Sequence, residues 1–275
     1  MTAGLLTRIT DALRLTTARP VLHRSVDVGE GPVVVLLHGL ASSWHTFSDL
    51  VPLLEPRHRV IALDLLGFGL SVAPPSTGFT IDEHVDAVAT SLRRLRLGGP
   101  VILVGHSLGA LVAARLAATT PRLVRHLVMI SPPIYPAAGD LTSSIDQAAM
   151  RAYTRAFDFL RSNKQFTIRN ATVLARLLPM QGILEVTEAN WHAFALSLEN
   201  SIQRQSTIVD VASVTVPVDV VYGSLDPLLL PAGIKVIGSM RQVTVHRVDG
   251  GDHVLRKRIA AAVAAVVDDD GARDS

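Results

Sequence analysis

The segment from Val101 to Ala117, VILVGHSLGALVAARLA, constrains the fold of this chain more than any other. It begins as an apolar, β-branched run typical of a strand covered on both faces, and it ends as an Ala- and Leu-rich pattern typical of a buried helix. Gly-His-Ser-Leu-Gly stands between the two, at residues 105–109. A serine at a bend between two buried elements adds little to stability, so we interpret Ser107 as a candidate for chemistry.

Other apolar runs alternate with helical patterns along the chain. The runs that we predict to be strands are PVVVLLHG, HRVIALDL, PVILVGH, VRHLVMIS, VPVDVVYG and RQVTVHRV. Thr80 and Glu83 have the spacing of a capping box ahead of a helix over Ile81–Leu97, and Pro121 ends a helical pattern over Ser107–Thr119. The alternation predicts an α/β fold, with a doubly wound, mostly parallel sheet and right-handed crossovers.

The segment between VMISPP and VPVDVVYG breaks this alternation, because roughly 80 residues are too many for a structureless loop in a compact domain. Two helical stripes of apolar side chains run through it: Ile145, Ala149, Tyr153, Phe157 and Leu160, and then Trp191, Phe194, Ala195, Leu198 and Ile202. We expect a helical cap at residues 132–212, inserted into a core formed by residues 1–131 and 213–275. Such a cap can be a lid over a site at the carboxyl ends of the strands, a helical unit with its own small core, or both.

The composition excludes several kinds of partner and site. The 275 residues include 26 Lys and Arg against 24 Asp and Glu, a net charge of +2, so the basic pI of about 9.3 reflects a small excess. Without a long basic run we expect no nucleic-acid partner. The absence of cysteine excludes disulfides, thiolate catalysis and Cys-based zinc sites. The longest apolar run, Ile259–Val267, is too short to span a membrane.

The first residues lack a signal-peptide pattern, so a cytoplasmic protein is expected. Leu5, Ile9 and Leu13 recur at helical spacing and predict a short N-terminal helix. Packing of this helix on the domain is the favoured interpretation, and binding to a membrane surface is the alternative.

The pattern Gly105-His106-Ser107-Leu108-Gly109 fits G-x-S-x-G, and it lies between a predicted strand and a predicted helix as a nucleophile elbow requires. Glycines at both ends leave room for a strained turn in which backbone segments approach closely. The N-terminus of the following helix supplies partial positive charge beside a developing oxyanion. A glycine-rich turn with an idle serine is the alternative, and the flanking elements disfavour it.

A serine hydroxyl needs a base to take its proton, and histidine is the natural candidate. In a fold of this kind the nucleophile is followed along the chain by the acid and then by the histidine, each on a loop after a strand. His126 and His246 lie within strand-like runs, and His192 lies in the helical insertion. His253, in VDGGDHVL, follows the last strand on a glycine-rich loop, so it is the predicted base.

The predicted acid is Asp226, which stands just past a strand end in VDVVYGSLDPLL. Asp219 lies inside that strand, and Asp249 and Asp252 share a loop with the histidine, which makes all three weaker candidates. An ordinary turn aspartate before proline is the alternative interpretation of Asp226.

The third requirement is a pair of donors for the oxyanion. His38-Gly39-Leu40 ends the strand VVVLLHG, where a backbone N–H can face the nucleophile. We predict the N–H groups of Leu40 and Leu108 as the two donors. For His38 itself a structural role under the loop is favoured over a catalytic one.

Together the segments LLHGLASSWHTF, DLLGFGLS, GHSLGA, GSLDPL and GGDHVL resemble the α/β-hydrolase-fold superfamily, in the serine-hydrolase branch with a helical cap after the sixth strand. They stand in family order and extend from about residue 30 to residue 267. The resemblance implies a serine hydrolase without cofactor or metal, with Ser107, Asp226 and His253 as a catalytic triad. It also implies a structural loop at the mouth of the site, formed by Asp64, Gly67, Gly69 and Ser71. Family sheets usually open with strands, whereas residues 1–15 have a helical pattern, so we expect the first edge strand to be absent.

The leading hypothesis for function is hydrolysis of a carboxylic ester through an acyl-enzyme. Aromatic residues of the cap, Phe157, Phe166, Trp191 and Phe194, favour an uncharged, hydrophobic, small-to-medium substrate, although such stripes more often form the core of a lid. The sequence does not indicate an oligomeric state.

The residues around the proposed nucleophile also bear on the alternatives to an esterase. Epoxide hydrolases and haloalkane dehalogenases of this family carry an aspartate as nucleophile, and Ser107 argues against both. Hydrolases of carbon–carbon bonds in ring-cleavage products typically carry Asn before and Met after the serine, so His106 and Leu108 weaken that alternative without removing it. A lactonase stays open as well. The non-enzyme alternative is a ligand-binding protein with a vestigial triad. The presence of all three triad residue types and of both glycines of the elbow disfavours it, because ligand binding requires none of them.

Overall fold

The computed structural model describes residues 19–136, 139, 141, 143–177 and 185–273. Its described residues form a seven-stranded sheet in the order β1-β3-β2-β4-β5-β6-β7. The strands are β1 (Arg24–Val28), β2 (Val33–Leu37), β3 (Arg59–Leu63), β4 (Val101–His106), β5 (Val124–Ile130), β6 (Val218–Gly223) and β7 (Val243–Val248). β1 is antiparallel to β3, and every other neighbouring pair is parallel.

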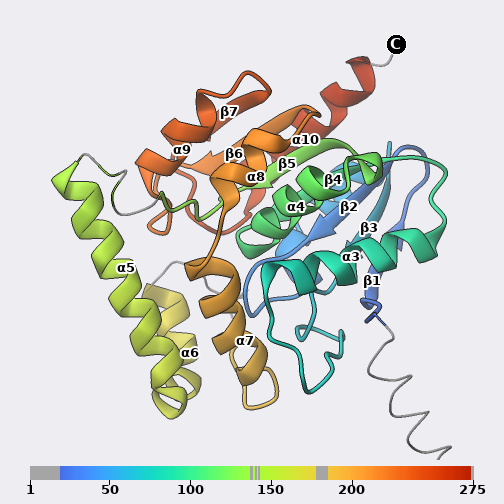
Figure 1. The fold of residues 1–275 in the computed structure, drawn as a ribbon. Helices are drawn as coiled ribbons and strands as arrows, with labels where there is room; N and C mark the ends of the chain where they lie inside the picture. The colour runs from blue at the N-terminus through green and yellow to red at the C-terminus, as the bar shows by residue number, and fades with distance from the viewer. Residues whose placement is uncertain (1–18, 137–138, 140, 142, 178–184, 274–275) are drawn as a thin grey trace, which may run out of the picture.

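Helices cover both faces of this sheet (Figure 1). They are α2 (Val51–Leu54), α3 (Ile81–Leu95), α4 (Leu108–Thr119), α5 (Ser144–Ser162), α6 (Lys164–Leu177), α7 (Trp191–Ser197), α8 (Thr207–Ser213), α9 (Pro231–Gly238) and α10 (Lys257–Arg273), with shorter turns η1 (Trp44–Phe47), η2 (Pro121–Leu123) and the π-helical η4 (Leu198–Gln203). Successive residues of β4 point to opposite faces of the sheet. Leu103 packs in the hydrophobic cluster that includes α3 and α4, and Ile102 packs in the cluster that includes α10. The predicted doubly wound α/β fold is therefore confirmed.

The six predicted strands correspond to β2 through β7, whereas β1 was not predicted. Its sequence, RSVDV, is short and largely exposed, so it has no apolar run to reveal it. β1 exists because it pairs with β3 at the edge of the sheet, a tertiary contact that local sequence does not encode. The predicted N-terminal helix lies outside the described residues.

The predicted capping box starts α3. Thr80 Oγ1 accepts from the Glu83 N–H at 3.3 Å, and Glu83 Oε2 accepts from the Thr80 N–H at 2.9 Å. The helix ends at Leu95, two residues before the predicted end, because Arg96 adopts a left-handed conformation with φ of 47°.

The segment between β5 and β6 contains α5 to α8. In Figure 1, α5, α6 and α7 gather together to one side of the sheet, whereas α8 lies against α4. An ion pair between Arg115 on α4 and Asp210 on α8, at 3.2 Å, joins these two helices. β5 is the fifth strand in the described part of the chain, whereas the resemblance implied an insertion after a sixth. Across the described ranges, no helix is long and apolar enough to cross a membrane.

Candidate active site

Ser107 occupies a strained turn between β4 and α4. Its φ of 53° and ψ of −118° are unusual for a residue with a side chain. The surrounding backbone allows this turn only with glycines: a Cβ on Gly105 would stand 2.3 Å from the Gly109 carbonyl oxygen, and a Cβ on Gly109 would stand 2.1 Å from the Leu37 carbonyl oxygen. The sequence therefore folds here into a sharp bend that presents the serine at the carboxyl end of β4.

Asp226 and His253 meet because β6 and β7 are neighbouring parallel strands, whose following loops lie side by side. His253 Nδ1 donates to Asp226 Oδ2 at 2.8 Å, and the side-chain exposures are 0% and 1%. The two loops are also in close backbone contact, since a Cβ on Gly223 would stand 2.3 Å from the Gly251 carbonyl oxygen. The Asp226–His253 pair is thus buried, and the two loops that carry it are packed closely against each other.

The carboxylate of Asp226 is anionic at neutral pH. Burial by itself raises its pKa, but the charge and hydrogen bond of His253 and the hydrogen bond from the Leu228 N–H outweigh burial, so the pKa lies below its ordinary value of 3.8. Leu228 donates to Asp226 Oδ1 at 2.9 Å. One carboxylate oxygen therefore holds the histidine, and the other holds the loop.

No hydrogen bond joins Ser107 to His253 among the described residues, and His253 Nε2 is buried without a partner there. Because Nδ1 is engaged by Asp226, Nε2 is the nitrogen left to accept a proton. Catalytic hydrogen bonds are often long in unliganded enzymes and tighten when substrate binds. The structure thus joins the predicted acid, Asp226, to the predicted base, His253. It shows no hydrogen bond between His253 and the predicted nucleophile, Ser107, among the described residues.

His106, which precedes Ser107, contacts the predicted base in a way that the sequence did not indicate. Its Nε2 donates to the His253 main-chain carbonyl at 2.8 Å, and the ring centroids are 5.0 Å apart. Burial lowers the pKa of His106 to about 3, so the ring is neutral at physiological pH. This hydrogen bond ties the histidine loop to the elbow.

The predicted oxyanion donors flank Ser107. A Cβ on Gly39 would stand 3.1 Å from the Ser107 Cβ, so the backbone before Leu40 lies against the elbow. Within the described ranges, neither the Leu40 N–H nor the Leu108 N–H has a hydrogen-bond partner. Two unpaired donors beside a nucleophile can stabilise an oxygen anion.

His38 lies under the same loop. Its Nε2 accepts from the Leu65 N–H at 2.8 Å and its Nδ1 donates to the Gly39 carbonyl at 2.8 Å, so both ring nitrogens are used. Burial lowers the pKa of His38 to about 4, which keeps it neutral. It holds the loop in place.

Asp64 organises the neighbouring loop, as the resemblance implied. Its carboxylate accepts from the Ser25 hydroxyl at 2.7 Å, the Leu70 N–H at 3.0 Å and the Trp44 N–H at 3.1 Å. Gly69 is required there, because a Cβ would stand 2.3 Å from Asp64 Oδ2. The carboxylate is thus occupied by structural hydrogen bonds.

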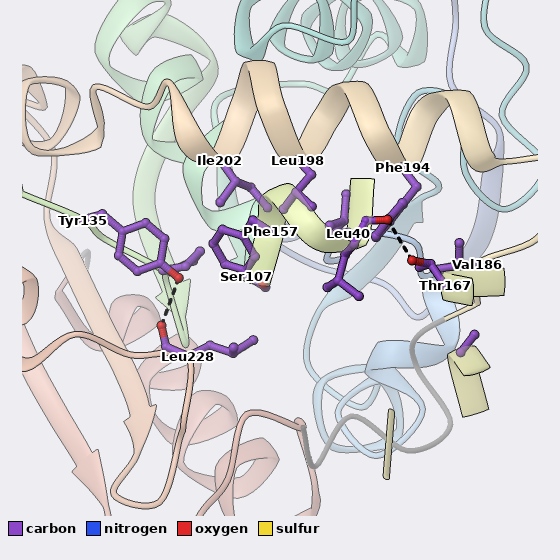
Figure 2. Close-up of a pocket in the computed structure, with 13 residues that line it drawn as sticks. Leu40, Ser107, Tyr135, Phe157, Thr167, Val186, Phe194, Leu198, Ile202 and Leu228 are labelled. Atoms are coloured by element: carbon purple, nitrogen blue, oxygen red, sulfur yellow. Dashed lines mark hydrogen bonds between the residues drawn. The ribbon is translucent and has the colours of Figure 1, made fainter. Parts of the chain in front are cut away.

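A pocket of about 70 Å³ opens over Ser107, between the core and the helices after β5 (Figure 2). Its lining residues are Leu40, Ser107, Pro133, Tyr135, Phe157, Leu160, Thr167, Ala171, Val186, Phe194, Leu198, Ile202 and Leu228. The Thr167 hydroxyl donates to the Leu160 carbonyl at 2.7 Å and the Tyr135 hydroxyl to the Leu228 carbonyl at 3.3 Å. The described lining contains no Asp, Glu, Lys, Arg or His. The hydroxyls of Thr167 and Tyr135 are thus engaged by main-chain carbonyls, whereas that of Ser107 has no hydrogen bond to the described residues.

Two of the four aromatic residues singled out from the sequence, Phe157 and Phe194, line this pocket. Trp191 packs against Phe194 at 5.6 Å between ring centroids, and Phe166 is 45% exposed. The described residues contain no cluster of three or more His, Asp or Glu side chains that could hold a metal ion.

A serine held in a strained strand-to-helix turn, with an Asp–His pair on later loops of the same parallel sheet, is the arrangement found in α/β hydrolases. The family model described as the alpha/beta hydrolase fold matches residues 32–255, and the chain belongs to this family.

Known proteins similar to this chain include two curated hydrolases. The chain is 41% identical to 2-(acetamidomethylene)succinate hydrolase of Mesorhizobium japonicum over 102 residues, which cover 37% of this chain and 36% of that protein. It is 31% identical to 2-hydroxy-6-oxo-6-(2'-aminophenyl)hexa-2,4-dienoic acid hydrolase of Metapseudomonas resinovorans over 120 residues, or 42% and 41% of the two chains. The chain thus spans well under half the length of these relatives.

The likeness in structure extends further. The crystal structure of E-2-(acetamidomethylene)succinate hydrolase matches with a TM-score of 0.67 and 25% identity, over 88% of this chain and 92% of that one.

Proposed function

We propose that this protein is a serine hydrolase of carboxylic esters. Ser107 is the nucleophile, His253 the general base and Asp226 the acid that orients it. The observation that carries the proposal is the buried 2.8 Å hydrogen bond between His253 and Asp226, which leaves His253 Nε2 as the free nitrogen of a histidine whose loop is tied to the elbow of Ser107. Such an arrangement activates a serine hydroxyl.

In the proposed reaction His253 Nε2 takes the Ser107 hydroxyl proton as the serine oxygen attacks the ester carbonyl. The N–H groups of Leu40 and Leu108 bind the oxygen anion of the tetrahedral intermediate. Collapse of the intermediate expels the alkoxide, which receives the proton from Nε2. Water then repeats the sequence on the acyl-enzyme and releases the carboxylic acid.

The uncharged pocket favours an ester over a carboxylate-bearing substrate. Burial of an unpaired carboxylate is very unfavourable, and no Lys, Arg or His lines the described part of the pocket. The proposed substrate is therefore a neutral, hydrophobic small molecule. A helical cap at residues 132–212 and a cytoplasmic location belong to the same proposal, and both rest on the sequence.

A second candidate is hydrolysis of a carbon–carbon bond in a ring-cleavage product. The similarity to the dienoic acid hydrolase of Metapseudomonas resinovorans supports it. That substrate bears a carboxylate by its name, and the apolar lining weighs against it. Lactone hydrolysis uses the same groups as ester hydrolysis and is the nearest variant of the first proposal.

The test is labelling with a fluorophosphonate, read by intact mass, followed by assays on neutral esters, lactones and a ring-cleavage dienoic acid. We expect one adduct on the wild type, none on Ser107→Ala or His253→Ala, and a normal adduct on Ser213→Ala, a matched change at an exposed serine. An unlabelled but folded wild type would contradict the proposal. Turnover of the dienoic acid alone would favour the second candidate.

A further inference from the structure

The loop that carries Asp226 is held by two tyrosines from the segment between β5 and β6. The Tyr153 hydroxyl, on α5, donates to the Pro227 carbonyl at 2.6 Å. The Tyr135 hydroxyl donates to the Leu228 carbonyl at 3.3 Å, as Figure 2 shows. The two carbonyls that directly follow the carboxylate residue are therefore both fixed from outside the core.

Tyr135 lines the pocket, and Tyr153 packs behind it in the same group of rings. Tyr135, Tyr153 and Phe157 form one ring cluster, with centroids 5.6 Å, 6.2 Å and 6.3 Å apart. Tyr135 and Phe157 line the pocket over Ser107 (Figure 2). A molecule in the pocket therefore touches rings whose cluster holds the acid loop.

Both phenols are donors under physiological conditions. Burial raises the pKa of Tyr135 and of Tyr153, and the negative charge of Asp226 adds to the effect on each. Neutral phenols keep their protons and can donate to the main-chain carbonyls. They hold the loop without competing for the carboxylate oxygens, which stay available for His253 and the Leu228 N–H.

We propose that Tyr153 and Tyr135 are positioning residues for the triad acid: through the Pro227 and Leu228 carbonyls they set the orientation of Asp226 toward His253 and couple it to the packing of rings around the substrate. The inference rests on the proposed function for its catalytic consequence. The attachment itself can be tested without activity.

The first measurement is amide hydrogen exchange at Leu228, whose N–H is bonded to Asp226 Oδ1. Tyr153→Phe and Tyr135→Phe keep the rings and remove the hydroxyls, and we expect exchange to become about 3- to 10-fold faster in each. Tyr222→Phe is the matched control, because the Tyr222 hydroxyl on β6 has no hydrogen bond to the described residues. Exchange that stays at the wild-type rate in both variants overturns the proposal.

The second measurement separates positioning from packing through kcat and KM on a neutral ester. A positioning role predicts kcat and the fluorophosphonate labelling rate about 3- to 10-fold lower in each variant, with KM unchanged, because the pocket wall keeps its rings. A raised KM with normal kcat would mean that the tyrosines only pack the wall, and it overturns the positioning role. If the wild type neither labels nor hydrolyses esters, the proposed function fails, and hydrogen exchange still decides whether the tyrosines hold the loop.

Discussion

His106 Nε2 donates a hydrogen bond of 2.8 Å to the main-chain carbonyl of His253. β5 and β6 separate the parent strands β4 and β7 in the sheet, so the loop after β7 reaches back across two strands to meet the elbow. The place of the proposed base thus depends on the side chain that precedes the proposed nucleophile.

Replacement of His106 tests this dependence. His106→Leu leaves the buried His253 carbonyl without a donor, and we expect a loss of about 1–3 kcal/mol in the free energy of unfolding and a roughly tenfold lower kcat. His106→Gln can place an N–H near the position of Nε2 and is expected to recover part of both. Urea unfolding and ester kinetics measure the two effects, and a leucine variant equal to the wild type would contradict the dependence.

Glycines of the elbow permit a second prediction. Gly105→Ala places a Cβ 2.3 Å from the Gly109 carbonyl oxygen, so we expect destabilisation on the order of 4 kcal/mol or failure to fold. Gly98→Ala is the matched control, since no atom lies within 4 Å of a Cβ built there. Thermal unfolding of both variants checks the contrast, which would vanish if the turn could relax at low cost.

The pocket should select acyl chains by length. Its volume of about 70 Å³ is well below the roughly 150 Å³ of an engineered cavity that admits benzene, so we expect esters of short acyl chains to react fastest. Phe194→Ala enlarges the pocket and should move the optimum to longer chains. Phe159→Ala, at a residue 49% exposed and outside the lining, should leave it unchanged. A series of p-nitrophenyl esters measures the optimum, and an optimum at long chains in the wild type would refute this reading.

Asp219 gives the fold a pH dependence away from the pocket. Its carboxylate accepts from His126 Nε2 at 2.7 Å and from His246 Nε2 at 2.6 Å. Burial raises its pKa, but these hydrogen bonds outweigh burial, so the folded pKa lies below the ordinary 3.8. The stabilisation is therefore complete above the unfolded pKa and is lost as the pH falls through the lower folded pKa.

Asp219→Asn should consequently cost about 1–3 kcal/mol in the free energy of unfolding at pH 7. The difference from the wild type should narrow as the pH falls below about 4, because the carboxylate of the unfolded wild-type chain takes up a proton there, before that of the folded protein. Urea unfolding at pH 7 and in acid provides the comparison, and a constant difference would show that the charge of Asp219 does not matter.

Sequence alone predicted the parts of the fold that carry their own signal. β2 to β7 are apolar runs, and α3 starts at a capping box formed by adjacent side chains. The sequence did not predict β1, because a short, polar edge strand forms through its pairing with β3 and has no apolar run of its own. The proposed roles of Ser107, Asp226 and His253 were inferred from chain order and loop position, and the structure adds the hydrogen bond between the last two.

Contacts to main-chain carbonyls could not have been predicted. His106, Tyr135 and Tyr153 each donate to a carbonyl far along the chain. Because every residue has a main-chain carbonyl, no residue type in the sequence indicates which one accepts. Tyr153 was singled out only as a member of an apolar stripe, and Tyr135 was not singled out at all. Their second role depends on where β5 and β6 bring the loops together.

One segment of the chain supplies most of the pocket wall, and this affects how the substrate selectivity of the protein could be changed by directed evolution. Most of its described lining residues lie within residues 133–202, and the others are Leu40, Ser107 and Leu228. A mutant library confined to that segment would explore new substrates while the reacting groups stay untouched. Tyr135 is the exception, because a substitution there alters the wall and the acid loop in one step.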